Sequence, residues 1–178
     1  MSSYTPVGWA NDETHPVSQA NLKTLDQGVV DVDALLATVQ SASRRRRETT
    51  NFDVPDNTGT IVPMNGVDYD YKAGNWSLSS SSEETIVTPG IYRITAGVVW
   101  GINSTGIRRL AIRAGGTVVA VSRANATASG TDEQNITVDV ALVLNDTVEV
   151  DVTQTSGGTL AVTASAATFR ALQLIRPT

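Results

Sequence analysis

Apolar residues recur at alternating steps of three and four positions between residues 18 and 42. This spacing is the heptad pattern of a coiled coil. Ser18 is a suitable N-cap, and Leu35 widens the apolar stripe in a way that suits three or more helices. The alternative is an amphipathic helix that packs on the chain's own sheet. We predict a self-associating helix over residues 18–42, with these seam residues: Leu22, Leu25, Val29, Val32, Leu36 and Val39.

From residue 52 onward the pattern changes to alternation between apolar and polar residues. Residues 92–100, 136–144 and 148–152 each place apolar side chains at every second position. This is the period of a strand with one buried face. Turn pairs such as Asn65-Gly66 and Pro89-Gly90 separate the alternating segments. The pattern therefore predicts a mainly β fold, an antiparallel β-sandwich, over residues 52–178.

The last alternating segment, Thr168–Ile175, is apolar on both faces. Its two leucines point one way, whereas Phe169, Ala171 and Ile175 point the other way. Because a strand that is apolar on both faces must be covered on both, one face needs a partner beyond the core. A second copy of the chain is the simplest partner. We therefore predict that Phe169, Ala171 and Ile175 contribute to trimerisation, together with the helical seam.

Residues 1–17 show no period and contain Pro6 and Pro16. We interpret this segment as an extended docking arm, in which Tyr4 and Trp9 anchor the chain to another surface. The alternative is a disordered tail.

Residues 43–51 are predicted to be a basic linker that contains four consecutive arginines. Arg44, Arg45, Arg46 and Arg47 are candidates for gripping an acidic surface of a particle. The alternative is a solvated linker whose arginines pair with nearby carboxylates, including Glu48. Nucleic acid is not expected as a partner, since no aromatic residues interleave the arginines to stack on bases.

Composition narrows the class of protein further. The net charge is −5, and only 17% of the residues are charged. The chain has no cysteine, which excludes a disulfide scaffold and a zinc site built on thiolates. Its start lacks the basic and apolar regions of a signal peptide, and no stretch is apolar enough to span a membrane. We expect a soluble protein made in a cytoplasm, without membrane contact.

Catalytic chemistry is not expected. His15, the single histidine, belongs to the arm, so one chain cannot form a Ser-His-Asp site inside the sandwich. Asp68 and Asp70 could hold Ca²⁺ or act as an acid/base pair, but no third ligand lies nearby in the sequence. The alternative is a pair of edge-strand charges that discourage aggregation. We predict a non-enzymatic protein without a metal or cofactor.

Five features follow one another along the chain: Trp76 before a turn, Pro89–Ile94 (PGIYRI), Leu110–Gly116 (LAIRAGG), Val140–Val150 (VALVLNDTVEV) and Thr168–Ile175 (TFRALQLI). In this order they resemble the trimeric jelly-roll head of the C1q and tumour-necrosis-factor group. Asn145 and Ala171 stand where the group has glycine. The resemblance spans about residues 52–178 and implies a jelly-roll sandwich that forms a homotrimer.

A second resemblance lies in Pro16–Val29 (PVSQANLKTLDQGV), which is similar to the opening of many fibre and tail-tip proteins of tailed phages. Together the two resemblances imply a homotrimeric phage fibre, spike or decoration protein, located in the virion after assembly in the host cytoplasm. Its N-terminus would dock to capsid, neck or tail proteins.

The implied knob would stabilise the particle or bind a host-surface glycan or protein. Loops 101–108 and 124–134 are candidates for that contact. The alternative function is a free-standing carbohydrate-binding or adhesion module.

Overall fold

The structure is a computed structural model of the 178-residue chain. It describes Gln27 and residues 42–71, 73–127 and 130–178. The chain divides into a unit of residues 1–37 and a second unit of residues 38–178, to which all the described strands belong. Apart from Gln27, the predicted arm and helix, with Tyr4, Trp9 and the six seam residues, lie outside the described residues.

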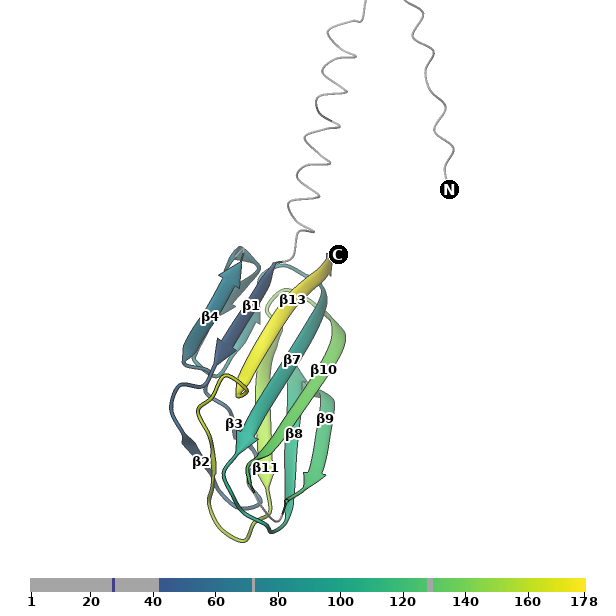
Figure 1. Cartoon of the computed structure of the whole chain (residues 1–178). Coiled ribbons are helices and arrows are strands. Elements are labelled where there is room, and N and C mark those ends of the chain that lie inside the picture. The colour runs from purple at the N-terminus through teal and green to yellow at the C-terminus, as the bar shows by residue number, and fades with distance from the viewer. Residues whose placement is uncertain (1–26, 28–41, 72, 128–129) are drawn as a thin grey trace, which may run out of the picture. The chain divides into compact units, whose positions relative to one another are not determined.

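Two antiparallel sheets form the second unit (Figure 1). Sheet A consists of β1 (Ser43–Arg47), β2 (Phe52–Val54), β4 (Gly66–Tyr71), β7 (Gly90–Trp100), β10 (Asp132–Leu142), β12 (Leu160–Val162) and β13 (Phe169–Pro177). Its order is β2-β12-β7-β13-β1-β4, and β10 pairs with β7.

Sheet B consists of β3 (Thr60–Ile61), β5 (Trp76–Leu78), β6 (Glu84–Ile86), β8 (Ile107–Ala114), β9 (Thr117–Asn125) and β11 (Thr147–Gln154). Its order is β5-β6-β11-β8-β9, and β3 pairs with β11. A 3-10 turn, η1 (Ala73–Asn75), precedes β5. No helix in the described part of the chain has the length and apolarity needed to cross a membrane.

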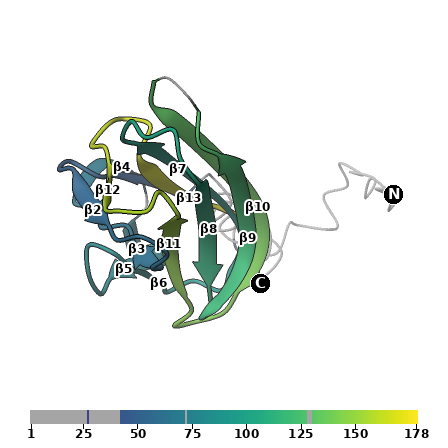
Figure 2. The same ribbon diagram turned by 90° about the horizontal axis from the view of Figure 1, so that it is seen from below.

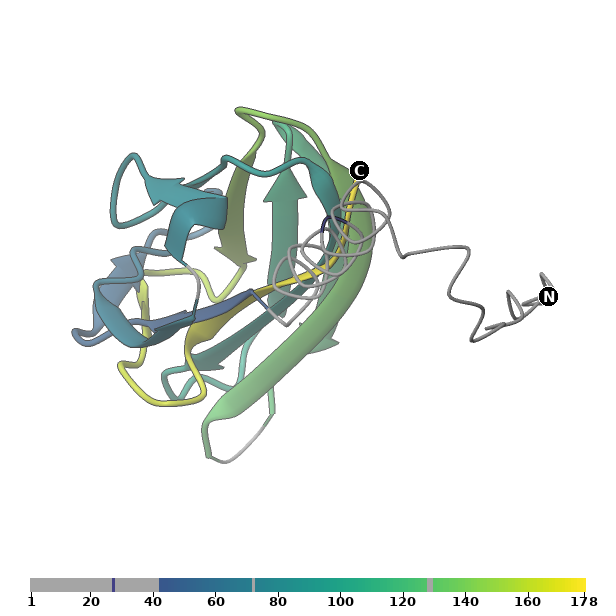
Figure 3. The ribbon, with the colours of Figure 1, turned by 90° about the horizontal axis from the view of Figure 1, so that it is seen from above.

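The core lies between the two sheets, as the views along the sandwich show (Figures 2 and 3). The alternation in β7 buries the side chains that the sequence assigned to the inner face, from Tyr92 to Trp100. In β11 the valines at 148, 150 and 152 meet them from sheet B. Alternation therefore identified the core strands correctly, because each of these strands has one buried face.

Tyr92 makes the stability of the core depend on pH in alkaline solution. Its hydroxyl is buried and donates to the carbonyl oxygen of Thr88 at 2.7 Å. Burial raises the pKa of Tyr92 to about 12 from its ordinary value of 10. The neutral phenol therefore contributes stability that is fully present below pH 10 and is lost as the pH rises through about 12. We expect the unfolding free energy to fall over this window, and to fall less in Tyr92→Phe, in parallel urea titrations.

The interpretation of residues 43–51 as a linker is wrong for its first half. Ser43–Arg47 form β1, which lies inside sheet A between β13 and β4. Four consecutive arginines carry no alternation that would mark a strand, although their backbone can pair like any other. Strand geometry then turns Arg44 and Arg46 inward and Arg45 and Arg47 outward. The folded head thus begins before residue 52.

Different segments of the chain lie at the two ends of the sandwich. β1 begins beside the end of β13, with Ser43 opposite Gln173, so the chain enters the head near its C-terminus (Figure 1). The loops that follow β7 and β9 lie at the opposite end.

Candidate functional site: the outer face of sheet A

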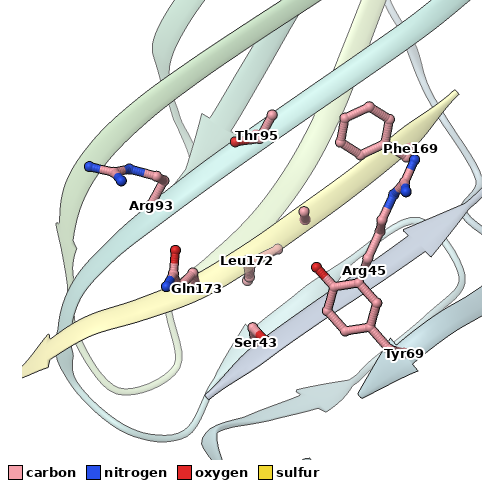
Figure 4. A pocket seen from close by; sticks show the side chains of 9 residues that line it. Ser43, Arg45, Tyr69, Arg93, Thr95, Phe169, Leu172 and Gln173 are labelled. Carbon is pink, nitrogen blue, oxygen red and sulfur yellow. The ribbon is translucent and has the colours of Figure 1, made fainter. Parts of the chain in front are cut away.

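The outer face of sheet A carries a groove of about 450 Å³. Small side chains form its floor, because Ala171 of β13 lies opposite Thr95 of β7 in the strand register. Larger side chains from four strands surround this floor (Figure 4). The lining residues are Ser43, Arg45, Tyr69, Arg93, Thr95, Phe169, Ala171, Leu172 and Gln173.

Arg45 and Phe169 form one wall of the groove. The guanidinium carbon of Arg45 lies 4.3 Å from the centre of the Phe169 ring. Its Nε also lies 3.5 Å from a carboxylate oxygen of Asp68, and an Nη donates to the carbonyl oxygen of Ala166. These contacts hold the aromatic ring and the cation in place, so the wall is preformed.

Arg93 and Asp139 form an exposed, bidentate ion pair at another margin of this face. Two guanidinium nitrogens donate to the two carboxylate oxygens, each at 2.8 Å. These hydrogen bonds raise the pKa of Arg93 and lower the pKa of Asp139. Both groups therefore stay ionised at neutral pH, and they present charge in a fixed geometry.

A second apolar surface lies where β9 and β10 run side by side at one edge of the sandwich (Figure 2). Ile136, Val138 and Val140 face inward from β10 but are only half-buried, although their partners in β7 are fully buried. On β9, Val118 and Val121 are 43% and 44% exposed. This edge thus leaves inward-facing residues of β10 half-covered, and it exposes valines of β9 that lie outside the core.

The structure places Phe169 and Ala171 in the groove, and Ile175 on β13 beyond it with 38% of its surface exposed. Two regions that the sequence pattern did not indicate also belong to the site. Tyr69 comes from the edge strand β4. The sequence of β9 and β10 shows only the pattern of an ordinary half-buried strand pair. A sheet face and an edge are recognisable only after the strand order is known.

Arg44 and Arg46 cannot act as the docking residues that the sequence indicated, because both side chains are buried between the sheets. Arg44 Nε lies 3.5 Å from Asp70 and 3.6 Å from Glu84. Arg45 and Arg47 remain on the surface, where both pair with Asp68.

A buried ionic cluster joins the two sheets behind β1, and no pattern along the sequence indicates it. Arg170 Nη2 lies 3.2 Å from Glu84, and both side chains are inaccessible to solvent. Arg170 also donates to the carbonyl oxygens of Ser82 and Val148 at 2.9 and 3.0 Å. Burial lowers the pKa of Arg170 and of Arg46. The cluster fixes sheet A to the segment that leads into β6.

Asp68 and Asp70 do not form a joint site. Arg45 pairs with Tyr69 and Arg46 with Val67, so Asp68 is the extra residue of a β-bulge. The bulge directs Asp68 toward the outward arginines, whereas Asp70 contacts Arg44 and accepts a hydrogen bond from the indole of Trp76. Within the described residues, no group of three or more His, Cys, Asp or Glu side chains could hold a metal ion.

Arg108 stabilises the loop after β7, at the end of the sandwich opposite the C-terminus. It is fully buried and donates to the carbonyl oxygens of Asn103 and Thr105 at 2.8 and 2.9 Å. Its Nε lies 3.8 Å from Asp132, at the start of β10. Trp100 is buried beside it, as a core residue. The loop after β7 is therefore preorganised, which favours binding because less order has to be imposed.

Neither a protein-family model nor a curated protein sequence matches the chain. Solved structures do match it over about three quarters of its length. Eiger TNF from S. frugiperda is 9% identical over 75% of this chain and 92% of its own, with a TM-score of 0.60. Murine APRIL is 12% identical over 76% and 99%, with a TM-score of 0.58. PRD1 vertex protein P5 is 16% identical over 77% and 97%, with a TM-score of 0.55.

These likenesses define the class of fold. The two described sheets form a TNF-like jelly roll, and the sequence-based prediction of this fold is confirmed. The neighbours include TNF proteins and a phage vertex protein, so the same fold serves more than one kind of protein.

Proposed function

We propose that this chain is a non-enzymatic structural protein of a phage virion, a homotrimeric fibre, spike or decoration protein. Residues 1–17 dock it to capsid, neck or tail proteins, residues 18–42 join three copies, and the sandwich forms the exposed knob. The knob stabilises the particle or attaches it to a glycan or protein on the host surface. The groove on the outer face of sheet A is the observation that carries this proposal.

Self-association is supported by two different uncovered surfaces on one chain. The groove is concave and lined by Arg, Tyr and Phe, which are enriched at protein interfaces. The β9–β10 edge carries partly exposed valines and an isoleucine. When the edge of one copy fills the groove of the next, the contact is heterologous, and such contacts form a ring when the rotation between copies closes. Three copies agree with the heptad stripe and with the resemblance to trimeric jelly-roll heads.

A location in the virion is supported by the likeness to PRD1 vertex protein P5 and by the phage-like opening at Pro16–Val29. The entry of the chain at one end of the sandwich also suits a protein anchored through its N-terminus.

Native mass spectrometry of the full chain should give three times the chain mass of 18.8 kDa. Deleting residues 1–17 should leave this trimer intact and abolish its co-sedimentation with particles, because only the arm contacts them. A well-folded monomer at high concentration would contradict the trimer. Unchanged co-sedimentation after the deletion would contradict docking through the arm.

A free-standing carbohydrate-binding module is the second candidate. Tyr69 is half-exposed beside Arg45 and Gln173, and exposed aromatic rings next to hydrogen-bonding groups suit sugars. In that case a soluble polysaccharide should bind the isolated head, and binding should weaken in Tyr69→Ala. If the groove instead lies in the trimer interface, polysaccharide binding should be insensitive to this substitution.

A further inference from the structure

Ile102 is the most exposed large apolar side chain in the part of the chain that the structure describes, at 72%. It lies in the loop of residues 101–106, which joins β7 to β8 at the end of the sandwich opposite the C-terminus (Figure 1). Ile107, the first residue after this loop, is 45% exposed. A single exposed aliphatic side chain is ordinary on a protein surface. Ile102 calls for an explanation because the loop that carries it is held in one conformation.

Arg108 holds this loop from the inside of the sandwich. Its buried guanidinium donates to the carbonyl oxygens of Asn103 and Thr105. Within the loop, the Thr105 amide donates to the side-chain oxygen of Asn103 at 2.8 Å. Burying a cation is costly, and the carboxylate of Asp132 offsets this cost from a distance of 3.8 Å. A loop that only connected two strands would not need such a residue.

Neighbouring loops hold the same loop from the outside. Gly106 has a positive φ of 82°, and an added Cβ would lie only 1.7 Å from the carbonyl oxygen of Thr155, so the two backbones are in contact. The Thr155 hydroxyl accepts from the amide of Ile107 at 2.8 Å, and the amide of Ala126 donates to the carbonyl oxygen of Gly106 at 2.9 Å. Ile102 is therefore presented on a fixed loop, and a partner that binds it has little order to impose.

The residues around Ile102 restrict the chemistry of a partner. Gly157 donates its amide to the carboxylate of Asp56 at 2.9 Å, which joins two further loops of this end. The sequences of the four loops contain no aromatic and no basic residue, and Asp56 is their one acidic residue. Apart from Ile102, the others are Pro, Ala, Gly, Ser, Thr and Asn. The four loops are residues 55–59, 101–106, 125–131 and 155–159.

This composition favours a protein as the partner. A polyanion or an anionic membrane would need basic residues, which the loops lack. A glycan would find hydrogen-bonding groups but no aromatic ring to pack against. A protein with an apolar pocket can bury the side chain of Ile102, while the small polar residues around it form hydrogen bonds and exclude water.

We propose that Ile102 is the central contact residue of a host-attachment surface, and that it inserts into an apolar pocket of a protein on the host cell. The inference rests on the host-attachment role of the knob proposed above, and it names the kind of partner and the residue that binds it. Because the surface is nearly uncharged, binding should depend little on salt.

Cell binding by variants of the full chain tests the contact residue. The fluorescently labelled chain is titrated onto intact cells of the strain on which the particles multiply. We expect Ile102→Asp to weaken binding by at least about tenfold, since a fully buried aliphatic side chain contributes on that scale. Ile102→Ala, which adds no charge, should weaken binding in the same direction. The matched control is Val143→Asp, at a residue that is 63% exposed in the turn between β10 and β11, and it should bind as the unmodified chain does.

Treatment of the cells tests the class of partner. Protease digestion of the cell surface should abolish binding, whereas periodate oxidation of surface glycans should leave it unchanged. Vesicles made from the lipids of the same cells should not bind the chain. Raising the salt concentration from about 0.05 to 0.5 M should change the affinity by less than about twofold. Loss of binding after periodate, or binding to the vesicles, would contradict a protein partner.

A glycine pair tests whether the fixed loop matters. Gly106→Ala must displace the loop from Thr155, so it should weaken cell binding although Ile102 is still present. Gly116→Ala is the control, because Gly116 also has a positive φ, of 76°, but an added Cβ would meet no atom within 4 Å. Equal binding by the two variants would mean that attachment does not depend on the conformation of the loop.

The results distinguish this inference from the proposed function. If the unmodified chain does not bind the cells, the host-attachment role is wrong, and the inference fails with it. If the unmodified chain binds and Ile102→Asp binds equally tightly, the inference is wrong and host attachment through another surface stands. Near-ultraviolet circular dichroism of each variant ensures that a loss of binding is not a loss of folding.

Discussion

Replacing Glu84 by glutamine should lower the free energy of unfolding by about 3–5 kcal/mol, as measured by urea denaturation at pH 7. Glu84 is the buried carboxylate that contacts Arg170, and its removal leaves that guanidinium in the core without a counter-ion. Arg44 loses one of its two carboxylate partners at the same time. A loss of stability on this scale is specific to buried charges, because water cannot replace the lost partner.

The matched control is Glu133→Gln. This glutamate is exposed on β10, where it accepts a hydrogen bond from Asn135. Its replacement should change the unfolding free energy by less than about 0.5 kcal/mol. Equal effects of the two substitutions would mean that the cluster behind β1 does not depend on its charge.

The second large effect is expected on assembly. Ala171→Glu places a charge on the floor of the groove, where a neighbouring copy would otherwise seat its apolar β9–β10 edge. The folded head tolerates this change, because the side chain points to solvent and lies next to Arg45. We expect sedimentation velocity to show that this variant dissociates at concentrations at which the unmodified chain stays associated.

The corresponding control is Ser77→Glu, which adds the same charge at an exposed position of β5 in sheet B. This variant should sediment as the unmodified chain does. If Ala171→Glu associates as tightly as the unmodified chain does, the groove is not part of the interface, and the basis for the proposed assembly is removed.

The sequence was sufficient for the strands that bury one face. β7 and β11 show their alternation directly, and the jelly roll follows from the order of these segments and their turns. The apolar residues on the second face of β13 also drew attention to the outer face of sheet A, where Phe169 and Ala171 line the groove. These features are local, so a pattern along the chain is enough to reveal them.

The sequence could not reveal features that depend on distant partners. Arg44 and Arg46 look like surface charges until Glu84, about forty positions away, is placed beside them. The opposite directions of Asp68 and Asp70 arise from a bulge, which is a property of two paired strands.

The position of β1 also has a mechanical consequence. The segment that leads from the proposed anchor does not end at the boundary of the head; it continues as a strand between β13 and β4. A pull on that segment along β1 loads the hydrogen bonds of both ladders in shear, because they run across the strand. The bonds must then yield together rather than one after another. Tension between particle and knob would thus be spread over two neighbouring strands.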